Sequence, residues 1–374
     1  MESIAREGPA LMFRRAIRRM SAYVPGEQPH PGRRFIKLNT NENPYPPSPG
    51  IRRVLAGAAG FLRLYPPPLA DDLIAAAARL YRLPRDMIVA GNGSDELLGM
   101  IFRATLGARD RVAYPLPTYS LYDTLAAIQE ARIIGVPWRE DFALPLDELV
   151  RARARLTVVC NPNSPTGTYT PTGKLATLAR GLGPRLLVID EAYVDFAAGN
   201  ALELVRRHRN VVVLRSFSKS FSLAGMRLGL GFASPEIIEQ LLKVKDSYNL
   251  SRLAIAVGAQ ALHDSDWMRR SVARIKTTRA RVEAQLRGIG FEVPPSQANF
   301  VMARMAGRNL APLVASLRRR GVLVRYFATP DLKDAMRITI GRPAEMAVLM
   351  RALRPLAAEL GRAPVSRPSA KRAQ

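Results

Sequence analysis

The chain has 374 residues, which is enough for two domains or one large domain and excludes a single-motif module. Hydrophobic residues make up 48% of it and charged residues 23%, a composition typical of a soluble globular protein and not of a disordered or membrane chain. The net charge of +25 raises nucleic-acid binding as a possible class, but the arginines are scattered and form no stripe interleaved with aromatic residues.

Cysteine and histidine counts restrict the chemistry further. The single cysteine, Cys160, excludes an intrachain disulfide, and three scattered histidines leave no His/Cys metal site. No apolar run approaches the roughly 18 residues that span a bilayer. We therefore expect a cytoplasmic protein that binds no metal and no membrane.

The two ends of the chain differ from its middle. Apolar residues between positions 11 and 20 are spaced for one helical face, and we expect this helix to pack on the body of the protein. The basic segment 361–374 has low hydrophobicity and two prolines, which indicates disorder.

Short apolar runs alternate with helical stretches through the first two thirds of the chain. This rhythm predicts an α/β protein with a three-layer αβα large domain, whose mostly parallel sheet has helices on both faces. From about Ser251 onward, long Arg-rich helices and a few late strands predict a smaller α+β domain. We assign residues 1–42 to an N-terminal arm that joins the small domain, 43–255 to the large domain and 256–360 to the small domain. The expected strands cover 87–90, 111–114, 132–136, 157–160, 186–189, 211–214, 299–303, 322–325 and 336–340.

Chemistry is expected in the turns after these strands, because parallel sheets bind ligands beyond the carboxyl ends of their strands. Lys219 follows the strand at 211–214, and burial would lower its pKa, which suits a Schiff-base nucleophile. Ser216 and Ser218 can donate hydrogen bonds to a phosphate, and Arg227 can grip it with two N–H groups.

Three other turns carry candidate residues. Asp190 follows the strand at 186–189, where an acidic residue taken alone is a helix cap more often than a catalytic carboxylate. Ser94 and Asp95 open a helix after a strand, and there the backbone amides favour an anion while the Asp95 carboxylate should point away. Tyr119 follows another strand and can lay its ring over a planar heterocycle.

Three motifs, in order along the chain, resemble the signatures of fold-type I pyridoxal-phosphate aminotransferases. They are Asn-Pro-Asn-Ser-Pro-Thr-Gly at 161–167, Asp-Glu-Ala-Tyr at 190–193 and Ser-Phe-Ser-Lys to Gly-Met-Arg at 216–227. Further segments resemble the histidinol-phosphate aminotransferases within this superfamily, namely those at 37–49, 64–66, 91–96, 190–196 and 336–341.

The resemblance implies pyridoxal 5'-phosphate as cofactor and assigns roles to single residues. Lys219 is similar to the lysine that holds the cofactor and moves a proton, Asp190 to the partner of the pyridinium nitrogen, and Tyr193 to the donor to the phenolic oxygen. Tyr119 is similar to the stacking ring. The implied phosphate cup consists of Ser94 and Asp95 through their amides, together with Ser216, Ser218 and Arg227.

The family often has asparagine immediately before Pro-Thr-Gly, where it contacts the phenolic oxygen. This chain has Ser164 there and Asn163 one residue earlier, so Asn161, Asn163 and Ser164 stay open as the contact. Tyr65 is similar to a tyrosine that reaches the phosphate from the neighbouring subunit, which implies a homodimer. The resemblance places Tyr23, Asn163, Arg325 and Arg337 at the substrate.

The expected reaction transfers the amino group of L-histidinol phosphate to 2-oxoglutarate, giving glutamate, as a step of histidine biosynthesis. A broad aromatic aminotransferase and a threonine-phosphate decarboxylase are alternatives on the same scaffold. A nucleic-acid-binding protein with a degenerate enzyme fold is a distant alternative, because the catalytic motifs leave no room for a DNA-reading module. We therefore expect no nucleic-acid partner.

Overall fold

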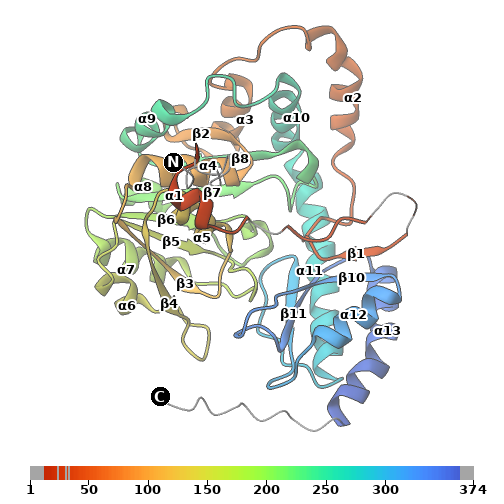
Figure 1. Cartoon of the computed structure of the whole chain (residues 1–374). Coiled ribbons are helices and arrows are strands. Elements are labelled where there is room, and N and C mark those ends of the chain that lie inside the picture. Colours follow the sequence, from red (N-terminus) through yellow and green to blue (C-terminus); the bar gives the residue numbers. More distant parts are fainter. Residues whose placement is uncertain (1–11, 23–24, 30–31, 33, 363–374) are drawn as a thin grey trace, which may run out of the picture.

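Two β-sheets organise the protein in the computed structural model, which describes residues 12–22, 25–29, 32 and 34–362 (Figure 1). The strands are β1 (Ile36–Leu38), β2 (Ile88–Asn92), β3 (Arg111–Leu116), β4 (Arg132–Pro137), β5 (Leu156–Cys160), β6 (Leu186–Asp190), β7 (Val211–Ser216), β8 (Leu228–Phe232), β9 (Phe300–Arg304), β10 (Val322–Tyr326) and β11 (Ala335–Thr339).

The helices fill the intervals between the strands. The α-helices are α1 (Arg15–Arg19), α2 (Pro49–Gly57), α3 (Asp71–Tyr81), α4 (Ser94–Thr105), α5 (Leu121–Ile128), α6 (Leu146–Arg151), α7 (Thr172–Leu182), α8 (Leu204–Arg207), α9 (Pro235–Val244), α10 (Arg252–His263), α11 (Ser265–Arg287), α12 (Ala311–Arg319) and α13 (Pro343–Arg362). Short 3₁₀ helices are η3 (Ala58–Phe61), η4 (Arg85–Met87), η5 (Val194–Phe196) and η6 (Ala224–Met226).

The larger sheet has seven strands in the order β2-β8-β7-β6-β5-β3-β4. All neighbours are parallel except β8, which is antiparallel to β2 and β7. The predicted mostly parallel sheet is confirmed. Its six predicted strands are β2 to β7, whereas β8 was not predicted, because its alternating glycines weaken the strand pattern.

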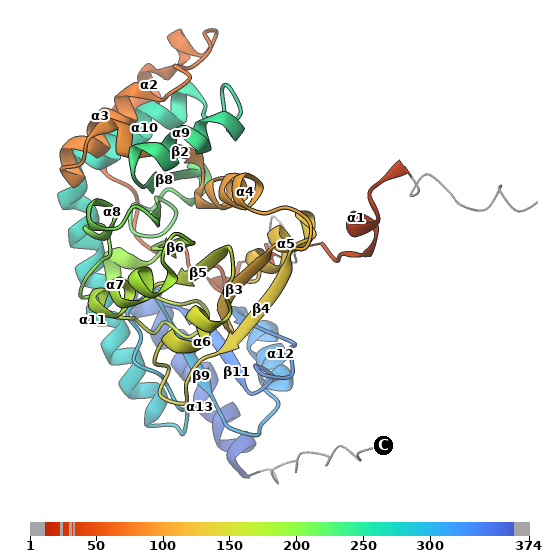
Figure 2. The ribbon, with the colours of Figure 1, turned by 90° about the vertical axis from the view of Figure 1, so that its left-hand side faces the viewer.

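Alternation of side chains along the central strands places apolar residues on both faces of this sheet. In β7, Val211 and Val213 belong to one buried cluster, and Val212 and Leu214 belong to another. Helices α3, α7 and α10 contribute to the first cluster, and α4, α5 and α9 to the second (Figures 1 and 2). Because both faces are covered, the central strands consist almost entirely of apolar residues.

The smaller sheet has the order β1-β10-β11-β9 and packs with α11, α12 and α13. Strand β1 pairs in parallel with β10, so a segment near the N-terminus joins strands almost 300 residues later in the chain. Strands β10 and β11 are antiparallel, and Arg325 lies directly opposite Arg337. Because directly opposite residues of an antiparallel pair point to the same face, the two arginines lie side by side on one face of the smaller sheet.

Helix α1 departs from the expected packing. Met12 and Phe13 are 86% and 61% exposed, and no residue of α1 is buried. Figure 2 shows α1 beyond α5 at the margin of the molecule, where Arg14 donates to the Ile128 carbonyl at 2.7 Å. The helix therefore contacts α5 of the body, as predicted, but the expected burial of its apolar face is not seen in the described residues. The predicted disordered tail lies almost wholly outside the described residues.

None of the helices that the structure describes is both long and apolar enough to cross a membrane.

Candidate active site

The carboxyl ends of β5, β6 and β7 meet at one edge of the larger sheet, beside a cavity of about 720 Å³. Cys160 and Asp190 are paired in register at the ends of β5 and β6, and Ser216 ends β7. All three residues line the cavity. The cavity extends to Arg325 and Arg337 of the smaller sheet, so it lies between the two sheets.

Lys219 enters the cavity from the loop that follows β7. Its Nζ donates to the Thr40 carbonyl at 3.2 Å. Burial, reinforced by the positive charge of Arg337, lowers the pKa of Lys219 to about 8. Its amine is therefore neutral in about one molecule in ten at pH 7, whereas almost every solvent-exposed lysine is charged.

Asp190 is enclosed beneath the same cavity and is 2% exposed. Tyr122 of α5 donates its hydroxyl to Asp190 Oδ2 at 2.7 Å, and the Ala192 backbone N–H donates to Oδ1 at 3.2 Å. Burial raises the pKa of Asp190 to about 6, although both hydrogen bonds oppose this rise. A cation placed against this carboxylate would relieve the penalty of its burial. Tyr122 was not singled out from the sequence, because nothing in the order of residues shows that its ring crosses to β6.

Tyr193 follows β6 and also lines the cavity. Its hydroxyl accepts a hydrogen bond from Asn41 Nδ2 at 3.0 Å, and its ring packs edge-to-face on Phe300. Burial raises the pKa of Tyr193 to about 12, so the hydroxyl keeps its proton at neutral pH.

A group of hydroxyl and cationic side chains lies at the N-terminus of α4. Arg227 contacts Ser218 Oγ at 3.3 Å and forms an ion pair with Asp95 at 3.0 Å. Glycines make this close approach possible: a Cβ on Gly93 would lie 2.7 Å from Arg227 Nη2, and one on Gly229 would lie 2.5 Å from the backbone N of Ser94. The Asp95 carboxylate thus contacts Arg227 rather than pointing away, contrary to our expectation.

Tyr119 lines the cavity beside this group, and its hydroxyl donates to Asp95 Oδ1 at 3.3 Å. Ser94, Asp95, Ser216, Ser218 and Arg227 line the cavity with it, so the structure brings the six predicted phosphate and stacking residues together.

The structure of the loop at 161–167 distinguishes the three residues that the sequence left open as the contact of the phenolic oxygen. The Asn163 amide donates to the Pro117 carbonyl and to Thr166, and Asn161 is bonded to Thr170. Ser164 lines the cavity, and Asn161 and Asn163 are not among its lining residues. The geometry therefore favours Ser164 as the contact from this loop and opposes the expected role of Asn163.

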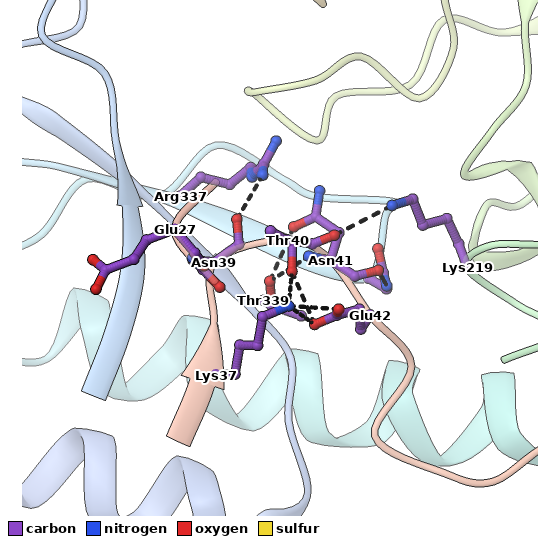
Figure 3. Close-up of polar contacts among 10 residues, drawn as sticks. Glu27, Lys37, Asn39, Thr40, Asn41, Glu42, Lys219, Arg337 and Thr339 are labelled. Atoms are coloured by element: carbon purple, nitrogen blue, oxygen red, sulfur yellow. Dashed lines mark hydrogen bonds and ion pairs between the residues drawn. The ribbon is translucent and has the colours of Figure 1, made fainter. Parts of the chain in front are cut away.

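Arg325 and Arg337 line the cavity from the smaller sheet, whereas Ser218 and Arg227 line it from the loop between β7 and β8 of the larger sheet. Arg337 donates to the Asn39 carbonyl at 3.0 Å (Figure 3). It also donates to Ser164 Oγ at 3.0 Å. Arg325 donates to the Pro25 carbonyl at 3.2 Å. Both guanidinium groups also lie against the Phe327 ring, at 5.4 and 5.7 Å from its centroid. Two adjacent guanidinium groups at a cavity wall can bind a phosphate or a carboxylate.

Besides Asn163, the predicted site residue Tyr65 is not among the residues that line the cavity. Tyr65 is 78% exposed and stacks on Tyr248 with the ring centroids 4.8 Å apart. Tyr23 lies outside the described residues.

The cavity fits pyridoxal phosphate on its own chemistry. It offers a lysine amine of lowered pKa, a buried carboxylate that no cationic side chain of the described residues bonds, a neutral tyrosine hydroxyl and, beside them, an arginine with serine hydroxyls at a helix N-terminus. The amine matches the aldehyde of the cofactor, and the carboxylate matches its pyridinium nitrogen. The tyrosine hydroxyl matches the phenolic oxygen, and the arginine with the serine hydroxyls matches the phosphate.

Comparison with known proteins agrees with this chemistry. Residues 33–353 match the sequence model of the family "Aminotransferase class I and II". A histidinol-phosphate aminotransferase of Trichormus variabilis is 43% identical over 345 residues, covering 92% of this chain and 98% of that protein. One from Gluconacetobacter diazotrophicus is 44% identical over 341 residues, covering 90% and 95%.

A solved structure is similar over almost the whole fold. The histidinol-phosphate aminotransferase of Sinorhizobium meliloti, in complex with pyridoxal-5'-phosphate, superposes with a TM-score of 0.85 at 27% identity, covering 96% of this chain and all of that one. By sequence and by fold, the chain belongs to the class I and II aminotransferases and, within them, to the histidinol-phosphate aminotransferase family.

Proposed function

We propose that this protein transfers the amino group of L-histidinol phosphate to 2-oxoglutarate, using pyridoxal phosphate. One observation carries the proposal: a single cavity is lined by Lys219 and Asp190 from the larger sheet, here called the cofactor end, and by Arg325 and Arg337 from the smaller sheet, here called the substrate end. The first end suits the cofactor, and the second suits the anionic group of an amino donor.

Pyridoxal phosphate, when bound, supplies a carbonyl that takes up the amino group and a ring that withdraws electrons from the neighbouring carbon. Asp190 would hold the proton on the ring nitrogen, with Tyr122 and the Ala192 amide fixing the carboxylate. Tyr193 and Ser164 would face the phenolic oxygen, and Tyr119 would cover the ring. The phosphate would be held by Ser94 and Asp95 through their amides and by Ser216, Ser218 and Arg227.

Lys219 would serve first as the attachment point and then as the base that moves a proton at the substrate carbon. A pKa of about 8 suits both tasks, because a neutral amine attacks a carbonyl and accepts a proton. The Thr40 carbonyl accepts from its Nζ and keeps the amine in the cavity.

Arg325 and Arg337 would bind the phosphate of the donor in the first half of the reaction and a carboxylate of 2-oxoglutarate in the second. Their pairing across β10 and β11 holds the two guanidinium groups beside each other. Tyr23 would cover this end of the cavity.

The test is to mix the cofactor-loaded protein with one amino donor at a time and follow a single turnover by absorbance. Fast conversion with histidinol phosphate supports the proposal. Faster conversion with tyrosine or phenylalanine would indicate an aromatic aminotransferase, and release of carbon dioxide from threonine phosphate would indicate a decarboxylase.

We also propose that the active form is a homodimer in which Tyr65 completes the site of the partner. Tyr65 belongs to a set of exposed apolar side chains that suits an interface, namely Leu62, Leu64, Tyr65, Leu69 and Tyr248.

Mixing the subunits of two inactive variants tests this arrangement. A dimer of one Lys219→Ala chain and one Tyr65→Ala chain keeps one intact site if Tyr65 acts across the interface. Random mixing of equal amounts should then restore about a quarter of the wild-type activity. No recovery in chains shown to have exchanged would mean that Tyr65 acts within its own chain.

A further inference from the structure

The segment Asn39–Asn43 passes directly beside Lys219, and of its side chains none has so far been given a role in the reaction. It runs between the smaller sheet and the loop after β7, with Thr40 bonded to Lys219 (Figure 3). Asn43 donates to the carbonyl groups of Lys219 and Ser220. The segment therefore contacts both sides of the cavity.

Asn41 is the buried centre of this segment, with 1% of its surface exposed. Its backbone N–H donates to Thr339 Oγ1 at 2.9 Å, and its backbone carbonyl accepts from Asn299 Nδ2 at 2.8 Å. Its side-chain Oδ1 accepts from the Thr339 hydroxyl at 3.0 Å, and Nδ2 donates to Tyr193 at 3.0 Å. Every polar group of Asn41 therefore has a partner.

These contacts fix the orientation of the Asn41 side-chain amide. The Thr339 hydroxyl already accepts from the Asn41 backbone N–H, and its own proton is free to go to Oδ1. With Oδ1 bound to Thr339, the NH₂ group must face Tyr193. If the amide were reversed, its NH₂ group would face the Thr339 hydroxyl proton. Its oxygen would face the Tyr193 oxygen, and these two acceptors would repel each other unless the Tyr193 hydroxyl donated to the amide oxygen.

The direction of this hydrogen bond decides where the Tyr193 proton points. The Tyr193 oxygen accepts from Asn41, so its single proton is directed elsewhere. In the part of the chain that the structure describes, that proton has no acceptor, and Tyr193 lines the cavity.

We propose that Asn41 is a positioning residue that holds the Tyr193 hydroxyl proton toward the cavity, ready for the phenolic oxygen of the cofactor. The inference rests on the proposed function. Donation from Asn41 also polarises the Tyr193 O–H bond and makes it a stronger donor.

The backbone and the surrounding charges determine which variants can test this role. Asn41 has φ of 57°, a left-handed conformation that glycine adopts without strain. Asn41→Gly therefore removes the amide without adding charge or backbone strain. The groups that act electrostatically on Tyr193 are Arg337, Cys160, Asp190 and Lys219, whose Nζ lies 5.8 Å from the ring, and none of them is altered by this variant.

The measurement is the pH at which the visible absorbance of the bound cofactor changes. A donor to the phenolic oxygen stabilises its charged form, so a weaker donor raises this midpoint. We expect Tyr193→Phe to raise it by about one pH unit and Asn41→Gly by about half as much. In the Tyr193→Phe background, Asn41→Gly should cause no further shift, because its effect passes through the missing hydroxyl.

A folded Asn41→Gly protein that binds the cofactor with the wild-type midpoint would overturn the inference, and so would a shift that adds to that of Tyr193→Phe. Thr339 provides a second route if Asn41→Gly fails to fold: Thr339→Val should raise the midpoint and Thr339→Ser should restore it. Failure of the proposed function itself would give a different result. The wild-type protein would then lack the visible absorbance of the bound cofactor or the turnover of the amino donor.

Discussion

The two ends of the cavity are built in different ways. At the cofactor end, Asp190 and Ser216 end neighbouring strands of one sheet, and Lys219 follows three residues after Ser216. At the substrate end, Arg337 contacts Ser164 and Asn39, residues that lie 173 and 298 positions away in the chain. The first end depends on strand order within a single sheet, and the second depends on how the two sheets pack.

This difference predicts different consequences of substitution. In the proposed function, residues at the cofactor end would act on the reacting atoms, so their loss should lower kcat. Residues at the substrate end would bind the anionic group of the donor, so their loss should mainly raise KM. The following variants test this contrast.

Lys219→Ala should cause the largest loss. The Lys219 amine is needed both to attach the cofactor and to transfer a proton at the substrate carbon. Without it, kcat should fall by at least about 1000-fold. Steady-state kinetics with histidinol phosphate measures this, and the visible absorbance that borohydride removes should disappear. Normal turnover by Lys219→Ala would refute the assignment of the cofactor end.

Asp190→Asn should lower kcat by about 100-fold, because a neutral amide cannot hold a proton on the ring nitrogen as a carboxylate does. The same variant should stabilise the cofactor-free protein at alkaline pH. The pKa of Asp190 is raised from 3.8 to about 6, so the buried carboxylate destabilises the fold above pH 6, and this penalty vanishes as the pH falls toward 4.

Urea unfolding of the two cofactor-free proteins measures the stability effect. At pH 8, Asp190→Asn should be more stable than the wild type by about 1 to 3 kcal/mol, and near pH 4 the two should be equal. Equal stability at both pH values would mean that the Asp190 carboxylate is not penalised in the fold.

Arg337→Gln should raise KM for histidinol phosphate by about 10- to 100-fold, since a charge-assisted hydrogen bond to the anionic group is lost. Its kcat at saturating donor should change less than that of Asp190→Asn. A donor without an anionic group on its side chain serves as the control and should lose less. A fall in kcat with unchanged KM would remove the contrast between the two ends.

Tyr122→Phe should have the smallest effect, a fall in kcat of about fivefold, because one of the hydrogen bonds that orient Asp190 is lost while the carboxylate stays. Since the Tyr122 hydroxyl lowers the pKa of Asp190, this pKa should rise in the cofactor-free variant. The pH range over which the free energy of unfolding changes should therefore move to higher pH. Tyr114→Phe is the control, because it removes a hydroxyl that is bonded to Asp123 instead, and it should leave this pH range unchanged.

The amino-acid sequence determined the strands and the motifs that follow them. Apolar runs such as the one at 211–214 are local signals, since alternate side chains must be buried on both faces of a covered sheet. The lysine, the carboxylate and the serines follow such runs directly, so the sequence alone predicts that they gather at one edge of the sheet, and there they line one cavity.

Only the tertiary structure decided which side chains face the cavity and what holds them. Asn163 and Ser164 are adjacent in the chain, yet Ser164 lines the cavity and the Asn163 amide is bonded to its own loop and to Pro117. The contacts of Tyr122 with Asp190 and of Asn41 with Tyr193 span 68 and 152 residues. Such contacts arise because packing brings distant buried polar groups together and each must find a partner, a condition that no local pattern of residues records.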